Sequence, residues 1–536
     1  MVKPGCQKRG AVVIALLRPG AQGICPDKRL IAVHDEDTGV RFDLGQSLAD
    51  RVSRTRLFGL LNPVHILSMG QTKAAFVAQS LARAYCALRR EGFREGGEDM
   101  NRKVVITAAL IGLLGVSAPP LAAKTQINMW YGLKGYLGKQ VQKVCGRFNA
   151  AQSDYQITCT GKGKYDQALQ AGIAAYRAKK HPHILQGVES ATATLMLSGA
   201  IYPAHQLMAD AGYDVNWSDY IGSIMNYYAS SDGKLYSFPF NSSTPVMYYN
   251  ADMYQKAGIA GPAKTWEQFE ENLRTMKAAG IQCPIAYSTY LWVHLEQYSY
   301  MHGEPIATRN NGYDGLDAEL VFNKTSYVKH VERLKRWYDD KLGSYAKELF
   351  GVGTRESFAT GKCGHYFGSI ASHGTVVKTA KMRWNVAPLP HNEGVSPNNT
   401  VVGGASLWIM KGFDEKEYKG VAAFFDFIRS VESQEFWSTV TGYVPTTKSG
   451  YEALLAKGFY KEAPYAGREI AIESLTRTPP TPLSRGLRLG NFRQIKKVLG
   501  KELEQMLAGK KTVQVALDDA AKRGNELLRR FEKQYK

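Results

Sequence analysis

The sequence predicts an α/β protein with more than one folding unit. The first reason is a region near residues 126–186 in which strand-like and helix-like stretches alternate, because this alternation produces a parallel sheet covered by helices. The second reason is the length of 536 residues, which exceeds what one ordinary hydrophobic core supports. A hydrophobic content of 44% and a charged content of 22% are those of a globular protein.

Each element of the alternating region is predicted from the spacing of its apolar side chains. Ligands gather beyond the carboxyl ends of strands in such sheets, so the polar loops at 161–165 and 188–190 are candidate binding segments. The first loop contains Gly and Lys but lacks Walker spacing, so it predicts no nucleotide site. In chain order, the elements are a strand at 126–131, a helix with apolar positions from 137 to 148, a strand at 155–159, a helix at 166–179 and a strand at 183–186.

The second half of the chain is predicted to be richer in helices. A helix begins after the capping residue Thr265 and runs through Ala279. Two helices close the chain, and the last starts near Thr512. Other elements are expected at 323–341 (helical), 358–366 (a turn and then a strand), 384–390 (extended) and 421–428 (a helix).

Three extended passages place polar residues among apolar ones. In the first, residues 235–250, two strand-like halves flank a hydroxyl-rich turn at 241–244. We interpret this passage as a segment that crosses between two lobes and lines a ligand cleft; the alternative is an ordinary hairpin turn with solvated hydroxyls. Residues 401–410 and 441–447 repeat the theme, and the Gly-Gly-Ala-Ser segment at 403–406 lets the backbone approach another group closely.

Residues 100–123 have the composition of a secretory signal peptide. Arg102 and Lys103 precede an apolar stretch too short for a comfortable membrane span, and Leu-Ala-Ala at 121–123 is a small-residue cleavage site before Lys124. No cysteine follows until Cys145, so no lipid anchor is predicted and the product is expected in the periplasm. Since a signal peptide belongs at an N-terminus, residues 1–99 are expected to be a non-native extension from a misassigned start site, with translation beginning at Met100. The alternative is a genuine cytoplasmic or targeting extension.

The cysteines bear on disulfides and on metal binding. Export permits disulfides, and the four cysteines after the signal segment allow three pairings. Proximity in the sequence and strand-like surroundings favour Cys145–Cys159 and Cys283–Cys363. None of the seven cysteines forms a CxxC pair, so no structural zinc, and no other cofactor, is predicted.

Six short motifs carry a family resemblance. Each is weak alone, but together they resemble the periplasmic sn-glycerol-3-phosphate-binding proteins of ABC importers, which are maltose-binding-protein-like members of extracellular solute-binding family 1. The resemblance covers about residues 127–533 and implies a two-lobed periplasmic-binding-protein fold of the α/β class, with three crossing hinge segments and a cleft between the lobes. Lobe 1 would comprise 124–240 and 402–441, and lobe 2 would comprise 241–401 and 442–536. The motifs are AGIAAYR at 171–177, NSSTPV at 241–246, GGASLW at 403–408, GYVP at 442–445, GLRLGN at 486–491 and RGNELLRRF at 523–531.

The resemblance also assigns a ligand site. It implies that Glu189 accepts hydrogen bonds from glycerol hydroxyls, while donors and a cation hold the phosphate. Ser369 is the weakest match, and Ser372 is a substitute for it. The ligand-binding residues implied are Tyr165, Glu189, Ser243, Ser369, Gly404, Tyr443 and Lys496, with Thr289, Tyr290 and Trp292 as a wall of the pocket.

Two of these positions depart from the family pattern. Lys496 stands where the family carries an arginine, which keeps the charge but loses the bidentate fork; Arg493, one turn earlier, could help. Thr289 stands where the family carries a tryptophan, so the pocket is expected to be wider. A wider pocket raises the prospect of a glycerophosphodiester such as glycerophosphocholine, whose cationic headgroup favours aromatic faces.

The function expected is therefore transport rather than catalysis. The protein would act as a monomer that binds glycerol-3-phosphate or a glycerophosphodiester and delivers it to ABC importer permease subunits with their ATPase. A net charge of +20 with scattered Lys and Arg, and no nucleic-acid-binding signature, predicts no nucleic-acid partner. The alternatives are a sugar or oligosaccharide binder using Trp130, Tyr131 and Trp292 as platforms, and a secreted enzyme, for which no catalytic motif occurs.

Overall fold

The computed structural model describes residues 30–34, 41–45, 123–345 and 349–536. The predicted signal segment, apart from its last residue, and nearly all of residues 1–99 lie outside these ranges, so both stay predictions. Residues 1–119 form a separate unit of the chain. In its described part, β1 (Leu30–His34) pairs antiparallel with β2 (Arg41–Gly45).

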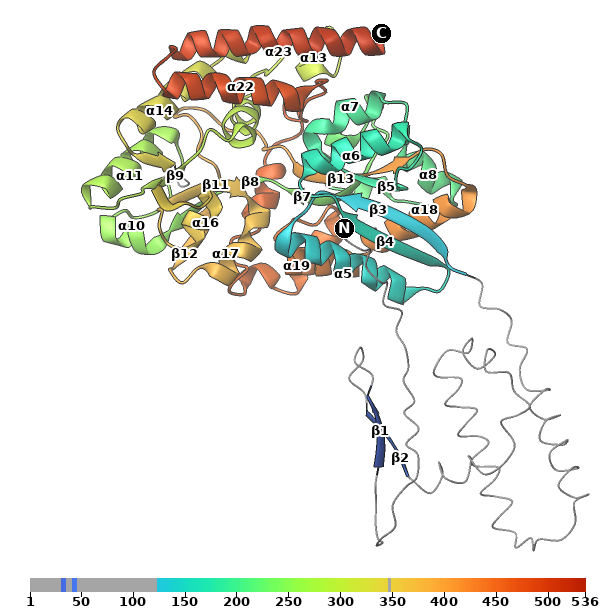
Figure 1. The fold of residues 1–536 in the computed structure, drawn as a ribbon. Coiled ribbons are helices and arrows are strands. Elements are labelled where there is room, and N and C mark those ends of the chain that lie inside the picture. Colours follow the sequence, from blue (N-terminus) through green and yellow to red (C-terminus); the bar gives the residue numbers. More distant parts are fainter. Residues whose placement is uncertain (1–29, 35–40, 46–122, 346–348) are drawn as a thin grey trace, which may run out of the picture. The chain divides into compact units, whose positions relative to one another are not determined.

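The unit at 120–536 contains two β-sheets, which Figure 1 shows at opposite ends of it. The first sheet has the order β4-β3-β5-β13-β6, and β7 pairs with β13. β3 is parallel to both β4 and β5, which confirms the parallel arrangement predicted from the alternating pattern. Its strands are β3 (Thr125–Tyr131), β4 (Tyr155–Gly161), β5 (Ile184–Val188), β6 (Ile201–Tyr202), β7 (Phe238–Ser243) and β13 (Gly403–Met410).

The second sheet is built from the middle of the chain. Its order is β10-β9-β11-β8-β12. β9 is parallel to β10 and β11, whereas β8 is antiparallel to β11 and β12. Its strands are β8 (Pro245–Asn250), β9 (Ile285–Tyr287), β10 (Gly343–Tyr345), β11 (His365–Ser369) and β12 (Trp384–Ala387).

Helices bury apolar faces against each sheet and form two main cores. Thr265 caps α11 through its side chain, as predicted, and Thr512 caps α23 in the same way, at the predicted start of that helix. Among the described residues, no helix combines the length and the apolarity needed to cross a membrane. The α-helices are α5 (Gly135–Ala151), α6 (Tyr165–Arg177), α7 (Thr192–Leu197), α8 (Ala204–Asp210), α9 (Gly222–Tyr228), α10 (Ala251–Ala257), α11 (Trp266–Ala278), α12 (Tyr298–Met301), α13 (Thr308–Gly312), α14 (Tyr327–Asp339), α16 (Thr354–Ala359), α17 (His373–Thr379), α18 (Glu415–Arg429), α19 (Val431–Val440), α20 (Lys448–Ala456), α21 (Ile470–Leu475), α22 (Phe492–Leu507) and α23 (Val513–Tyr535).

The three extended passages at 235–250, 401–410 and 441–447 lie side by side where the sheets meet, and they are the crossing segments. Ser242 pairs with Gly404 on one side and with Val444 on the other, and the Val444 N–H donates to the Ser242 carbonyl at 2.9 Å. The turn predicted at 241–244 is wrong, because β7 continues to Ser243 and β8 starts at Pro245. Backbone partners on both sides hold this polar stretch extended and buried, which also excludes the solvated hairpin. The two-lobed α/β fold is confirmed.

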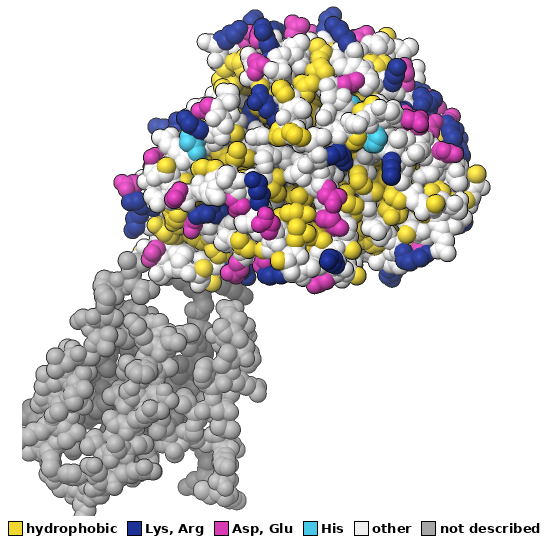
Figure 2. Space-filling model, turned by 180° about the vertical axis from the view of Figure 1, so that it is seen from behind, with side chains coloured by type: hydrophobic (Ala, Val, Ile, Leu, Met, Phe, Trp, Pro, Cys, Tyr) yellow, Lys and Arg dark blue, Asp and Glu magenta, His cyan; other side chains and the backbone are white. Residues whose placement is uncertain are grey.

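Both predicted disulfides are present. Cys145 is bonded to Cys159, and Cys283 to Cys363. The first joins α5 to β4, and the second joins the segments that lead into β9 and β11. On the face shown in Figure 2, basic and acidic side chains are interspersed.

Candidate functional site

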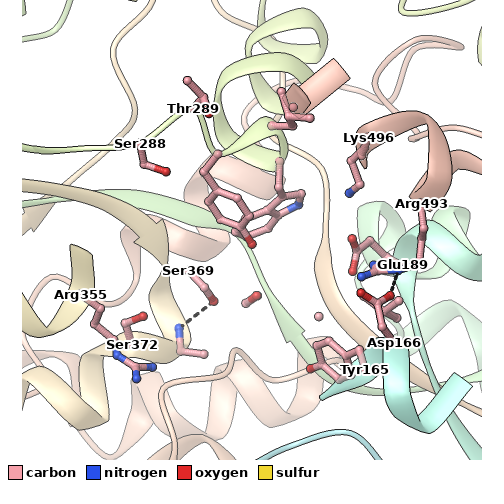
Figure 3. A pocket seen from close by; sticks show the side chains of 18 of the residues that line it. Tyr165, Asp166, Glu189, Ser288, Thr289, Arg355, Ser369, Ser372, Arg493 and Lys496 are labelled. Atoms are coloured by element: carbon pink, nitrogen blue, oxygen red, sulfur yellow. Dashed lines mark hydrogen bonds and ion pairs between the residues drawn. The ribbon is translucent and has the colours of Figure 1, made fainter. Parts of the chain in front are cut away.

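A cavity of about 550 Å³ lies at the crossing segments, and its lining includes all ten residues that the family resemblance assigned to the ligand site. Figure 3 shows Tyr165, Glu189 and Lys496 on one wall and Ser369 on the opposite wall. Contact of each residue with a ligand stays a prediction. The ten residues are Tyr165, Glu189, Ser243, Thr289, Tyr290, Trp292, Ser369, Gly404, Tyr443 and Lys496.

Parallel strands of both sheets end at this cavity. Tyr165 opens α6 after β4, and Glu189 follows β5 directly at the start of the 3-10 helix η2 (Glu189–Ala191). In the second sheet, Ser369 is the last residue of β11, and Thr289 follows β9, which is parallel to β11. The polar residues therefore occupy the carboxyl ends of strands, where ligands gather in α/β sheets.

The crossing segments supply Ser243, Gly404 and Tyr443. Gly404 has a φ of +103°, and a Cβ there would lie 1.9 Å from the Asn241 carbonyl oxygen, so no other residue fits without a backbone shift. The Asn241 side chain donates to the Tyr165 hydroxyl at 2.8 Å and accepts from Gln186 at 2.8 Å. These bonds fix the Tyr165 phenol at the edge of the cavity.

Glu189 is a buried carboxylate, with 6% of its surface exposed. Burial raises its pKa, the nearby Lys496 ammonium opposes that rise, and Glu296 adds to it. The Lys496 ammonium lies 2.7 Å from a Glu296 carboxylate oxygen whose side chain is 2% exposed. The cation predicted to meet the phosphate therefore already has a buried partner within the protein.

Arg493 is paired with residues of the same wall instead of projecting freely into the cavity. Its guanidinium forms an ion pair with Asp166 on α6 and donates to the Ser190 hydroxyl at 2.9 Å. The hydrogen bond from Arg493 lowers the pKa of Asp166 below its ordinary value. α22 packs into the core that contains the second sheet, and α6 covers the first sheet, so this pair links the lobes.

The wall with Thr289, Tyr290 and Trp292 is partly aromatic. Tyr290 is 50% exposed and its ring centroid lies 5.8 Å from that of Trp292. Trp292 is buried, and it packs so closely on Gly403 that a Cβ there would lie 2.0 Å from the indole. By contrast, Trp130 and Tyr131, both in the described part of the chain, are not among the lining residues.

The structure adds lining residues that the sequence did not indicate. Arg355 on α16 faces the cavity near Ser372, as Figure 3 shows. Ser372, the substitute for Ser369, shares a hydrogen bond with the Tyr366 hydroxyl at 3.2 Å. No local pattern marks Arg355, because its position depends on how α16 packs against β11. Among the described residues, no group of three His, Cys, Asp or Glu side chains is arranged to hold a metal ion.

Comparison with known proteins places the chain in a family. The sn-glycerol-3-phosphate-binding periplasmic protein UgpB of Escherichia coli strain K12 is 42% identical over 419 residues, covering 77% of this chain and 95% of the relative. UgpB of Yersinia pseudotuberculosis is 42% identical over 435 residues, covering 80% of this chain and 98% of the relative.

Two solved structures share the fold. UgpB from Mycobacterium tuberculosis in complex with glycerophosphocholine has a TM-score of 0.64 at 20% identity and covers 76% of this chain and 100% of its own. The cyclic alpha-maltosyl-1,6-maltose binding protein from Arthrobacter globiformis has a TM-score of 0.60 at 18% identity, with coverages of 76% and 100%. A family model described as bacterial extracellular solute-binding protein matches residues 143–465. The chain therefore belongs to the family of bacterial extracellular solute-binding proteins.

Proposed function

We propose that the protein is the substrate-binding component of an ABC importer for sn-glycerol-3-phosphate, glycerophosphodiesters or both. The observation that carries the proposal is the cavity where the buried carboxylate Glu189 and the cation Lys496 lie with hydroxyl donors at the crossing segments. Such a site offers an acceptor for glycerol hydroxyls and donors for a phosphate. The names of the relatives at 42% identity point to the same ligand class.

In the binding mode that we propose, Glu189 and Tyr165 meet the glycerol hydroxyls. Lys496, Ser243 and the backbone N–H of Gly404 hold the phosphate, with Ser369 and Tyr443 completing the contacts. Each charge-assisted hydrogen bond contributes about 1.5–3 kcal/mol, so four or five give micromolar affinity or better after the cost of ordering. Lys496 would then divide its hydrogen bonds between the ligand and Glu296.

Binding is proposed to close lobe 1 (124–240 and 402–441) on lobe 2 (241–401 and 442–536) about the three crossing segments. The permease subunits with their ATPase would then recognise the closed monomer. The relatives are named as periplasmic proteins, and we propose that this chain reaches the periplasm through a signal segment at 100–123 that is cleaved before Lys124, without a lipid anchor. Mass spectrometry of the native protein tests this: a mature N-terminus at Lys124 is expected, and any peptide from residues 1–90 would contradict it.

Calorimetry with purified protein tests the ligand class. Glycerol-3-phosphate and glycerophosphocholine serve as test ligands, and maltose stands for the sugar alternative. We expect binding of a glycerol phosphate and none of maltose, because two of the three aromatic platforms proposed for a sugar do not line the cavity. Glu189→Ala should weaken binding of both phosphates at least tenfold; unchanged binding would overturn the site assignment.

A further inference from the structure

One wall of the cavity carries a cation that the proposed binding mode does not use. Arg355 lines the cavity with Ser372, and Figure 3 shows both across from Lys496 and Arg493. Arg355 is the second residue of α16, which packs against β11 and α17, the elements on either side of Ser372. Both side chains therefore come from the second sheet and its helices, whereas Glu189 lies at the end of the first.

Lys497 also lines the cavity, and the partners of the other three cations in the described lining differ between the two walls. Lys496 pairs with the buried Glu296, and Arg493 pairs with Asp166. Arg355 pairs with Glu356, its neighbour in the chain, at 2.5 Å, and the two side chains are 38% and 46% exposed. An exposed pair of this kind contributes little to stability, so Arg355 can exchange Glu356 for an anion at small cost.

The charge of Arg355 extends into the cavity. Burial raises the pKa of Tyr443 and of Tyr366, and the Arg355 charge opposes the rise in both cases. Tyr366 also shares its hydrogen bond with Ser372. The carboxylates in the described lining are Asp166 and Glu189, both on the first-sheet side. Glu356, the partner of Arg355, is not among the lining residues, so a cationic headgroup near Arg355 would meet a like charge and no carboxylate of the described lining.

We propose that Arg355 and Ser372 form a second anion subsite, which selects glycerophosphodiesters whose alcohol moiety carries a further negative charge over those with a cationic headgroup. This inference rests on the proposed function, since the glycerol phosphate must occupy the Glu189 and Lys496 side. Arg355 can then offer its guanidinium fork to a phosphate or carboxylate, and Ser372 adds a hydroxyl donor.

Calorimetry of the exported protein, which is expected to begin at Lys124, tests the proposal with four ligands at pH 8. They are glycerol-3-phosphate and three diesters that differ in the charge of the alcohol moiety. This moiety is cationic in glycerophosphocholine, neutral in glycerophosphoglycerol and anionic in glycerophosphoglycerol esterified with a terminal phosphate. We expect the anionic diester to bind about tenfold or more tightly than the cationic one. Arg355→Gln should weaken the anionic diester about tenfold and leave glycerol-3-phosphate within twofold.

Arg383→Gln is the matched control, because Arg383 pairs with Asp252, is 68% exposed and lies outside the cavity lining; it should change none of the four affinities. Thermal melting shows that each variant is folded. Equal weakening of all four ligands by Arg355→Gln would overturn the subsite, because Arg355 would then contact the shared phosphate. Wild-type preference for glycerophosphocholine over the anionic diester would overturn it too. Failure of folded wild-type protein to bind any of the four would instead refute the proposed function.

Discussion

In the proposed binding mode, the carboxyl group of Glu189 makes ligand binding depend on pH. Burial raises its pKa above the ordinary value of 4.5, and only the ionised form accepts hydrogen bonds with both oxygens. We therefore expect affinity for a phosphodiester, whose own charge is constant in this range, to fall from pH 7 toward pH 4, starting above pH 4.5. Calorimetry across that range measures the effect.

Glu189→Gln supplies the control for this prediction. The variant should bind at least tenfold more weakly at pH 7 and show no pH step, because it has no proton to gain. Acid unfolding through Glu189 does not explain a loss in the wild type. A raised pKa means that the folded protein takes up this proton first, so the contribution of Glu189 to stability grows as the pH falls through its folded pKa. The same pH step in both proteins would contradict the prediction.

Gly404 is the second residue whose role can be tested alone. Gly404→Ala forces a Cβ onto the Asn241 carbonyl oxygen at a φ of +103°, so we expect a loss of about 1–3 kcal/mol in the free energy of unfolding. Gly146→Ala in α5 is the matched control: its Cβ meets no atom within 4 Å, and alanine should add about 0.5–1 kcal/mol there. Urea unfolding measures both, and equal effects at the two sites would refute the backbone argument.

The second disulfide ties together the segments that lead into β9 and β11. The bond Cys283–Cys363 spans 80 residues, whereas Cys145–Cys159 spans 14. If disulfides act mainly by restricting the unfolded chain, removing the disulfide that closes the longer loop lowers the free energy of unfolding by about 1.5 kcal/mol more than removing the other one. Urea unfolding of the two double Cys→Ala variants measures this difference. If the two losses of free energy of unfolding were equal, or larger for Cys145–Cys159, native-state packing would outweigh chain entropy here.

Some elements could be predicted from local patterns and others could not. β3, α5, β4 and α6 follow from periodicity, since each buries one part of its surface and leaves another part exposed. The sequence predicts a turn at 241–244 because Asn, Ser and Thr favour turns in isolation, whereas pairing with 404 and 444 holds these residues extended. No pattern in the sequence indicates Arg355 as a site residue, because only the packing of α16 brings it to the cavity. The site on the crossing segments was accessible from the sequence because motif order carried a family resemblance.

Arg493 joins the two lobes at the cavity. It reaches from α22 to Asp166 and Ser190, so the lobes contact each other through it. The ligand is proposed to bind the closed arrangement, and anything that favours closure beforehand therefore raises affinity. The pair is partly exposed, which limits its contribution to about 1 kcal/mol.

Arg493→Ala should therefore expand the ligand-free protein in small-angle X-ray scattering and weaken ligand binding about fivefold, since about 1 kcal/mol of closure is lost. Asp166→Asn should have the same two effects. In the double variant, the second substitution should add little, because the first has already removed the contact. If the two losses of affinity instead added in full, each residue would act on the ligand by itself, and the contact between the lobes would have no part in closure.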